Sequence, residues 1–257
     1  MIIDANAFVG RWPFRRLAFA GASGVGALMD RNETDLALAT PIAAVFYRDC
    51  LSAMEEMLED EGWDADRMSP VAVVNPVFPG WETDLEVMVG QMGCVAVRLI
   101  PNYHGYRLYD DEALALVSKV QGYGLPVIIT IRMQDERSHH WRMVVDPVSP
   151  DEVRFLMREL PHGKYVLSNI RYPEVVQIRR ELEEVEEGVW EISYKPPAFF
   201  VEQAVETFGA ERILYGTRVP LQYPESILLM VREAQVSHEV KEMILAGNAR
   251  RVFGFRD

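Results

Sequence analysis

MIIDANAFVG (residues 1–10) reads as a short buried strand that ends at Asn6-Ala7-Phe8. It is the first of eight short apolar runs, and a longer amphipathic stretch separates each run from the next. Strands buried on both faces read as nearly continuous apolar segments, which is typical of a parallel sheet covered by helices. The eight runs are MIID (1–4), DLALAT (35–40), SPVAVVNPV (69–77), CVAVRLI (94–100), LPVIITI (125–131), KYVLSNI (164–170), VWEIS (189–193) and RILYGT (212–217).

The stretches between the runs have helical patterns. Examples are RDCLSAMEEMLEDEG (48–62), DDEALALVSKVQGYG (110–124) and SPDEVRFLMRELP (149–161). Ser149 is a suitable N-cap because Pro and two acidic residues follow it. Eight strand–helix units in 257 residues, with no Ser/Gly-rich linker, predict one (β/α)8 TIM-barrel domain over residues 1–257.

The bulk composition excludes several classes of protein. A formal net charge of -13 argues against nucleic-acid binding, because a phosphate backbone requires a basic face. The longest apolar runs fall short of the about 18 residues that span a membrane. Two cysteines, Cys50 and Cys94, provide neither a disulfide framework nor a zinc motif. We therefore expect a cytoplasmic protein with no nucleic-acid or membrane partner.

Alternation along two strands predicts which side chains face the barrel interior. In CVAVRLI the large outward set is Val95, Val97 and Leu99, so Arg98 faces inward. In VIITIR the same reasoning turns Thr130 and Arg132 inward. In YVLSNIR (165–171) either alternate set of residues could face the interior, and periodicity does not choose between the two sets.

Six segments carry a resemblance to a known family. MIIDANAFVG, CVAVRLIP, GLPVIIT, KYVLSN, ERILYGTRVP and GNARRVFGF are similar to the amidohydrolase-related barrels, in the branch of aminocarboxymuconate-semialdehyde decarboxylase-like enzymes. The similarity runs from Met1 to Phe255. It implies a (β/α)8 barrel with its site at the C-terminal ends of the strands. It also implies one divalent metal, held by two strand-1 histidines, a strand-5 histidine or equivalent and a strand-8 aspartate, with a strand-6 histidine assisting.

This sequence departs from that pattern at every position. The strand-1 pair falls on Asn6 and Phe8, the strand-5 position on Thr130, the strand-6 position on Asn169 and the strand-8 aspartate on Arg218. Phenylalanine has no lone pair to donate, and arginine keeps a positive charge that repels a divalent cation. We therefore expect no metal and no other cofactor.

The alternative is a metal-dependent hydrolase with atypical ligands drawn from the remaining histidines. These are His104, His139, His140, His162 and His238. Adjacent His139 and His140 point in opposite directions on an extended segment, and His162 precedes its strand, at the wrong end of a barrel.

The inward residues predict a site for a small anion. Arg98, Arg132 and Arg218 lie at one mouth, and guanidinium groups bind carboxylates through two parallel hydrogen bonds. The polar side chains of Asn6, Thr130 and Asn169 would orient the rest of such a ligand. The alternative is that the arginines only pair internally, with acids such as Asp4 and Glu191.

Other residues are expected around this ring. Arg171 and Lys195 are placed just above it, and RWPFRR (11–16) is either a lid, an oligomer contact or an ordinary packed loop. His104 is a candidate general base, although a loop histidine of this kind is more often only solvated.

Three functions follow from these observations. The first is a metal-independent hydrolase or decarboxylase acting on a small carboxylated substrate. The second is a non-catalytic barrel that binds a small anion, forms a homo-oligomer or acts as a partner subunit of an active homologue. The third is the metal-dependent hydrolase with other ligands.

Overall fold

The computed structural model describes residues 1–135, 137, 139–194 and 199–255. All strand pairs within these ranges are parallel, and their order follows the chain. The strands are β1 (Ile3–Val9), β2 (Leu36–Pro41), β3 (Met68–Pro70), β4 (Ala72–Val73), β5 (Val97–Leu99), β6 (Val127–Thr130), β7 (Lys164–Ser168), β8 (Glu187–Glu191) and β9 (Ile213–Leu214).

Backbone hydrogen bonds join the strands into a (β/α)8 barrel, as the sequence predicts. β3 and β4 flank Val71, whose N–H donates to Ala39 of β2, so the two short strands follow one another as the third strand of the barrel. On the other side, Ala5 N–H donates to the Tyr215 carbonyl (3.0 Å) and Arg218 N–H to the Asn6 carbonyl (2.7 Å). These bonds tie the chain after β9 to β1.

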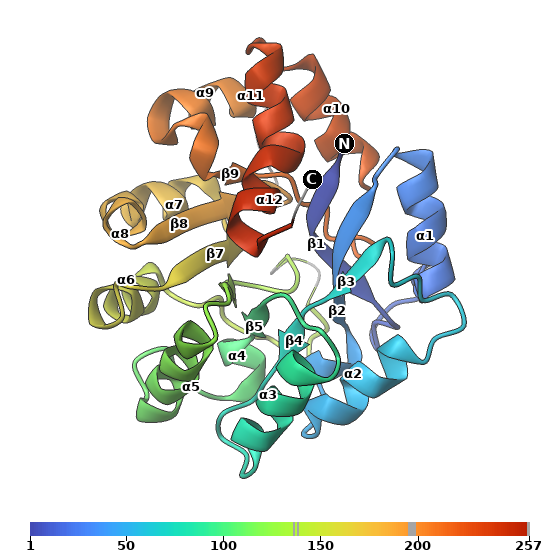
Figure 1. Cartoon of the computed structure of the whole chain (residues 1–257), viewed down its shortest axis with the longest axis vertical. Helices are drawn as coiled ribbons and strands as arrows, with labels where there is room; N and C mark the ends of the chain where they lie inside the picture. Colours follow the sequence, from blue (N-terminus) through green and yellow to red (C-terminus); the bar gives the residue numbers. More distant parts are fainter. Residues whose placement is uncertain (136, 138, 195–198, 256–257) are drawn as a thin grey trace.

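Helices form an outer ring around the strands (Figure 1). The predicted cap at Ser149 is confirmed, since its side chain accepts from Glu152 N–H at 3.2 Å. The helices are α1 (Ala22–Arg31), η1 (Ala43–Val45), α2 (Cys50–Leu58), α3 (Trp81–Gly90), α4 (Pro101–His104), α5 (Asp111–Gly122), α6 (Pro150–Glu159), α7 (Tyr172–Gln177), α8 (Arg179–Glu184), α9 (Phe200–Phe208), η3 (Ala210–Arg212), α10 (Glu225–Glu233), α11 (His238–Glu242), η4 (Met243–Gly247) and α12 (Asn248–Phe253).

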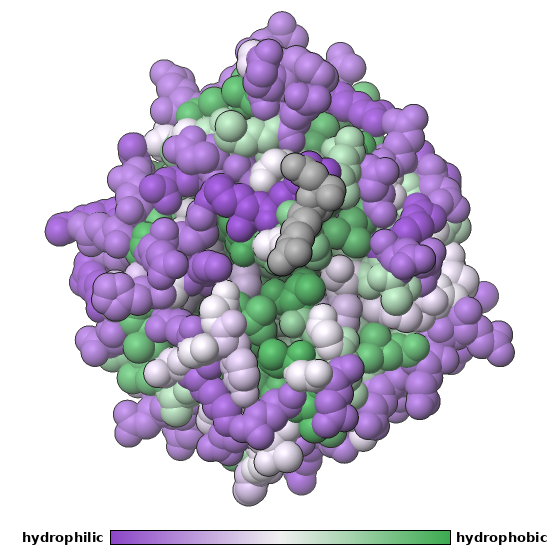
Figure 2. Space-filling model, viewed as in Figure 1, coloured by the Kyte–Doolittle hydropathy of each residue, from purple (hydrophilic) through white to green (hydrophobic). Residues whose placement is uncertain are grey.

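The last helix covers the N-terminal end of the barrel. Ala249, Val252 and Phe253 of α12 pack in one cluster with interior residues of the strands, such as Ile3 and Ile128. Figure 1 shows α12 and both chain ends on this side, and Figure 2 shows hydrophobic residues gathered near the middle of the same face. The opposite end, at the C-terminal ends of the strands, is the mouth of the barrel.

The predicted strand parities are confirmed in the middle of both strands, but the prediction for Val95 is wrong, because Val95 packs against the interior cluster. Val97 and Leu99 pack in the outer core, while Ala96 belongs to the interior cluster. In β6, Ile129 faces the helices and Ile128 faces inward at the lower layer. Arg98 and Thr130 are therefore placed in the upper interior, where no solvent reaches either residue. None of the described helices is long and apolar enough to cross a membrane.

Candidate functional site

The structure brings all six predicted site residues to the mouth of the barrel. Each is buried, with at most 7% of its surface exposed. Three of them lie within β1, β5 and β6, and the other three lie in the segments that follow β6, β7 and β9. The parallel arrangement of the strands brings all six to one end of the barrel. The six residues are Asn6, Arg98, Thr130, Arg132, Asn169 and Arg218.

The guanidinium group of Arg98 lies inside a shell of neutral side chains. Its Nε donates to Thr40 Oγ1 (2.9 Å), and its Nη1 donates to Thr130 Oγ1 (3.0 Å) and Ser168 Oγ (3.1 Å). Its Nη2 donates to Asn6 Oδ1 at 3.0 Å. Burial lowers the pKa of Arg98 to about 10, so the group still carries its charge at neutral pH.

Asn6 connects this arginine to a buried acid. Its Nδ2 donates to Asn169 Oδ1 (3.0 Å) and to Glu191 Oε1 (3.1 Å). Glu191 also accepts the backbone N–H groups of Asn169 (2.6 Å) and Ser193 (2.7 Å). Both carboxylate oxygens of Glu191 thus have hydrogen-bond donors from the protein itself.

Arg132 has an acidic partner that the sequence did not suggest. Its Nη1 donates to Glu174 Oε2 (2.8 Å) and to the Asn169 carbonyl (3.0 Å), and its Nη2 also pairs with Glu174. Glu174 also accepts from Arg171 N–H at the start of α7. The segment RYPE (171–174) has the Pro and Glu of a helix start, but nothing in its sequence indicates that the Glu reaches across to Arg132.

Arg218 is bound more sparsely than the other two arginines. Its Nη2 donates to the Met133 carbonyl (2.9 Å), and its Cζ lies 5.1 Å from the centre of the Tyr194 ring. Its Nε is buried and has no hydrogen-bond partner, and Arg218 forms no ion pair with any described residue. Burial lowers its pKa to about 10; Tyr194 and Glu191 oppose this shift, while Arg15 and Arg132 add to it.

Two of the site residues have left-handed backbone conformations. Asn169 has φ 56° and Arg218 has φ 61°. Non-glycine residues in this region cost about 1–3 kcal/mol and cluster at functional sites. At Asn169 the reversal lets Ser168 and Asn169 both contribute to the interior network, although they are consecutive. This explains why alternation alone could not assign a parity to YVLSNIR.

The alternative was that the three arginines only form internal ion pairs, with acids such as Asp4 and Glu191. Glu191 and Asp4 accept mainly from backbone N–H groups and from hydroxyl or amide side chains, and neither forms an ion pair with a described arginine. Arg132 does pair internally, but with Glu174. Lys195 lies outside the described residues. The assignment of the three arginines to ligand binding remains a prediction.

His104 has a backbone partner. Its Nε2 lies 2.8 Å from the Ala44 carbonyl, which fixes the proton on that nitrogen. Burial lowers the pKa of His104, so the imidazole is neutral at pH 7. Its Nδ1 is buried without a partner among the described residues. His104 is therefore a packed residue at the end of α4 and not a solvated loop histidine, and its role as general base stays a prediction.

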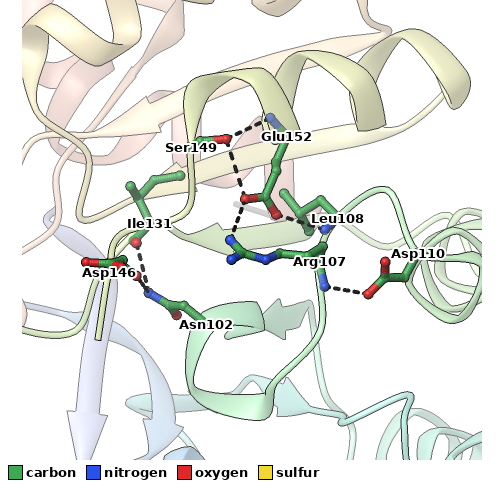
Figure 3. Close-up of polar contacts among 8 residues, drawn as sticks. All are labelled: Asn102, Arg107, Leu108, Asp110, Ile131, Asp146, Ser149 and Glu152. Carbon is green, nitrogen blue, oxygen red and sulfur yellow. Dashed lines mark hydrogen bonds and ion pairs between the residues drawn. The ribbon is translucent and has the colours of Figure 1, made fainter. Parts of the chain in front are cut away.

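Two further groups of hydrogen bonds connect the loops of the mouth to one another (Figure 3). Asn102 Nδ2 donates to the carbonyls of Ile131 (3.3 Å) and Asp146 (2.9 Å), joining α4 to the segment after β6. Glu152 at the start of α6 accepts from Arg107 (3.1 Å) and from Leu108 N–H (3.1 Å). The segments on either side of Arg132 are thus attached to the loop after β5.

RWPFRR lies beside the mouth and lines a cavity of about 1090 Å³ with the end of β2 and α2. None of the six site residues lines this cavity. Trp12 packs edge-on against Phe46 and Tyr103, and Arg15 donates to the Leu221 carbonyl. The segment is therefore attached to the rim of the mouth, and its roles as lid or oligomer contact remain predictions.

The side chains at the positions that the family pattern assigns to the metal are poor ligands for a divalent ion. Within the described ranges, no three His, Cys, Asp or Glu side chains lie close enough together to hold a metal ion. The side-chain oxygen atoms of Asn6 and Thr130 are neutral and already accept hydrogen bonds from Arg98. The Phe8 ring lies 4.8 Å from the same guanidinium group. Borderline metals require imidazole, thiolate or carboxylate ligands, and a guanidinium repels them.

The fold and the position of the site define an amidohydrolase-type barrel. The sequence model of the amidohydrolase family matches residues 22–255, and the chain belongs to this family. No curated protein matches the chain.

Solved structures with the same fold include aromatic-acid decarboxylases. The 5-carboxyvanillate decarboxylase from Sphingomonas paucimobilis is 14% identical, with a TM-score of 0.73 and 99% of each chain covered. The dihydroxybenzoic acid decarboxylase from Polaromonas sp. JS666, with bound manganese and the inhibitor 2-nitroresorcinol, is 15% identical (TM-score 0.73; 100% of this chain and 98% of that one). A putative amidohydrolase from Staphylococcus aureus is 12% identical (TM-score 0.75; 99% of each chain). At these identities the similarity shows the fold alone.

Proposed function

We propose that this barrel binds a small carboxylated molecule at its mouth without a metal, and that Arg218 holds the carboxylate. The observation that carries the proposal is the buried Nε of Arg218, which has no partner, on a guanidinium without an ion pair among the described residues. A buried charge without a counter-ion costs several kcal/mol, and a bound carboxylate would remove that cost.

The surroundings of Arg218 support an anion over a neutral ligand. The guanidinium groups of Arg15 and Arg132 oppose its charge, and Arg132 lies against the other partner of Arg218, the Tyr194 ring, at 5.0 Å. An anion beside Arg218 would relieve this repulsion and accept a charge-assisted hydrogen bond. Arg98 and Arg132 then contribute through their positive charge, since Arg98 and both Nη atoms of Arg132 already donate to the protein.

The carboxylated aromatic acids named with the similar structures suggest the first probes. Because Arg218 is 7% exposed, ligand entry requires the segments at Met133 and Tyr194 to part. The structure supports binding more directly than turnover, because the buried acids at the mouth accept hydrogen bonds from the protein.

The test is a thermal-shift titration of EDTA-dialysed protein with 2,6-dihydroxybenzoate and with benzamide as the neutral control. A ligand at 100 times its Kd stabilises the folded state by about 2.7 kcal/mol. We expect a shift with the carboxylate that Arg218→Ala abolishes and the control Arg48→Ala, at an exposed arginine, retains. A shift that appears only after Mn²⁺ or Zn²⁺ is added would favour the metal-dependent alternative.

A further inference from the structure

Three of the five side chains at the positions that the family pattern assigns to the metal contact Arg98 directly. Asn6 and Thr130 each accept a hydrogen bond from its guanidinium group at 3.0 Å, and the Phe8 ring lies 4.8 Å from Cζ. Asn169 is one hydrogen bond further away, through Asn6. Three side chains that would lie around a metal ion in the family pattern thus lie around a guanidinium here, while Arg218 contacts Met133 and Tyr194 instead.

We propose that the Arg98 guanidinium is a built-in cation that stands at the point where the metal ligands of the family converge and takes over the electrostatic role of that ion. This inference does not depend on ligand binding by Arg218. It concerns the charge balance of the barrel interior, which must hold whether or not a ligand is present.

The acids around the mouth require such a cation. Glu191 has no exposed surface and Asp4 is 3% exposed. The Asn6 amide connects Glu191 to Arg98, because its Oδ1 accepts from Arg98 while its Nδ2 donates to Glu191. Two buried carboxylates without a nearby positive charge would cost several kcal/mol.

The shape of the cation also fits its surroundings. Four of the five N–H donors of Arg98 reach oxygen atoms on β1, β2, β6 and β7. A lysine ammonium carries three donors and cannot reach four partners. A divalent ion placed in the same shell would meet the fixed positive charge at a distance of a few ångströms.

The first experiment removes the cation and then its counter-ion. We expect Arg98→Met to lower the Tm strongly, and Arg98→Met/Glu191→Gln to have a Tm about 5 °C above that of the single variant, because the stranded carboxylate is gone. The matched control is Arg212, which donates to the Leu182 and Gly188 carbonyls away from the mouth. Glu191→Gln should not raise the Tm of Arg212→Met. A double variant no more stable than Arg98→Met overturns the proposal.

If Arg98→Met and its double variant do not fold, Arg98→Lys replaces them. Lysine keeps the charge, so Glu191→Gln should then lower the Tm of Arg98→Lys. An increase instead would show that the charge at this position does not balance Glu191, and would overturn the proposal.

The second experiment is metal binding by the wild-type protein. After equilibrium dialysis against Mn²⁺ or Zn²⁺, mass spectrometry should find less than roughly 0.2 equivalents bound, since the donor set does not suit these ions. Stoichiometric metal that Asn6→Ala removes would show that an ion enters the shell beside Arg98, and would contradict the inference.

Discussion

Arg218 lies over the ring of Tyr194, with its Cζ 5.1 Å from the ring centre. This contact holds a buried guanidinium that forms no ion pair with a described residue. The Tyr194 ring and the Met133 carbonyl offset part of the desolvation cost of this charge, and its Nε stays without a partner. The bonding of the Arg218 guanidinium is therefore incomplete among the described residues.

Arg218→Ala should leave the folding stability within about 1 kcal/mol of wild type. The change removes one bond to a carbonyl and one ring contact, but it also removes a desolvated charge, while alanine leaves the strained φ of 61° unchanged. Urea denaturation provides the measurement. A loss of about 3–5 kcal/mol would instead mean that Arg218 is half of a buried ion pair.

Glu174→Gln should destabilise the protein by about 3 kcal/mol. Glu174 forms a bidentate pair with the buried Arg132 and also accepts from Arg171 N–H, so its loss weakens two segments of the mouth. The control is Glu184→Gln, which breaks an exposed i,i+4 pair with Arg180 and should leave the denaturation midpoint unchanged. Equal effects of the two changes would contradict the importance of the buried pair.

Gly216→Ala should cost about 1–3 kcal/mol, because a Cβ there would lie 2.8 Å from Glu191 Oε2 and 3.0 Å from Asn6 Cβ. Gly90→Ala, at the end of α3, places its Cβ in open space and should be neutral or slightly stabilising. Thermal melts of both variants provide the comparison. A tolerated Gly216→Ala would mean that the Asn6–Glu191 contact is looser than described.

Asp4 should give the protein a measurable pH dependence. Burial raises the pKa of Asp4 to about 6, so between its unfolded value of about 4 and pH 6 the folded state holds more protons than the unfolded state. Stability should therefore fall as pH rises through this window, by up to about 3 kcal/mol, and remain level above it. Asp4→Asn should remove this slope in denaturation curves between pH 4 and 8. A slope that persists in the variant would assign it to another group.

The sequence predicted the barrel well because each strand is marked by a short run of apolar residues that are neighbours in the chain. Short runs such as CVAVRLI and VIIT carry both the strand and its orientation, and Val97, Leu99 and Ile129 pack outward as expected. Alternation failed at Asn169 because a left-handed residue breaks the two-residue period. The last barrel strand could be located from RILYGT, yet its pairing with β1 depends on hydrogen bonds between residues more than 200 positions apart.

The sequence predicted which residues form the site but not the hydrogen bonds between them. Substitutions at Asn6, Phe8 and Thr130 indicated an altered metal position, and their contacts with Arg98 depend on the convergence of separate strands. Thr40, Ser168 and Glu174 were missed because a small hydroxyl or a helix-capping acid carries no sign of its distant partner.

The most direct test of the central claim is a crystal structure of the EDTA-dialysed protein with 2,6-dihydroxybenzoate. We predict a carboxylate oxygen about 2.8 Å from Arg218 Nε, the usual length of a charge-assisted hydrogen bond, with no metal ion beside it. A ligand held through a metal ion, or bound with its carboxylate away from Arg218 while Nε stays unpaired, would contradict the account.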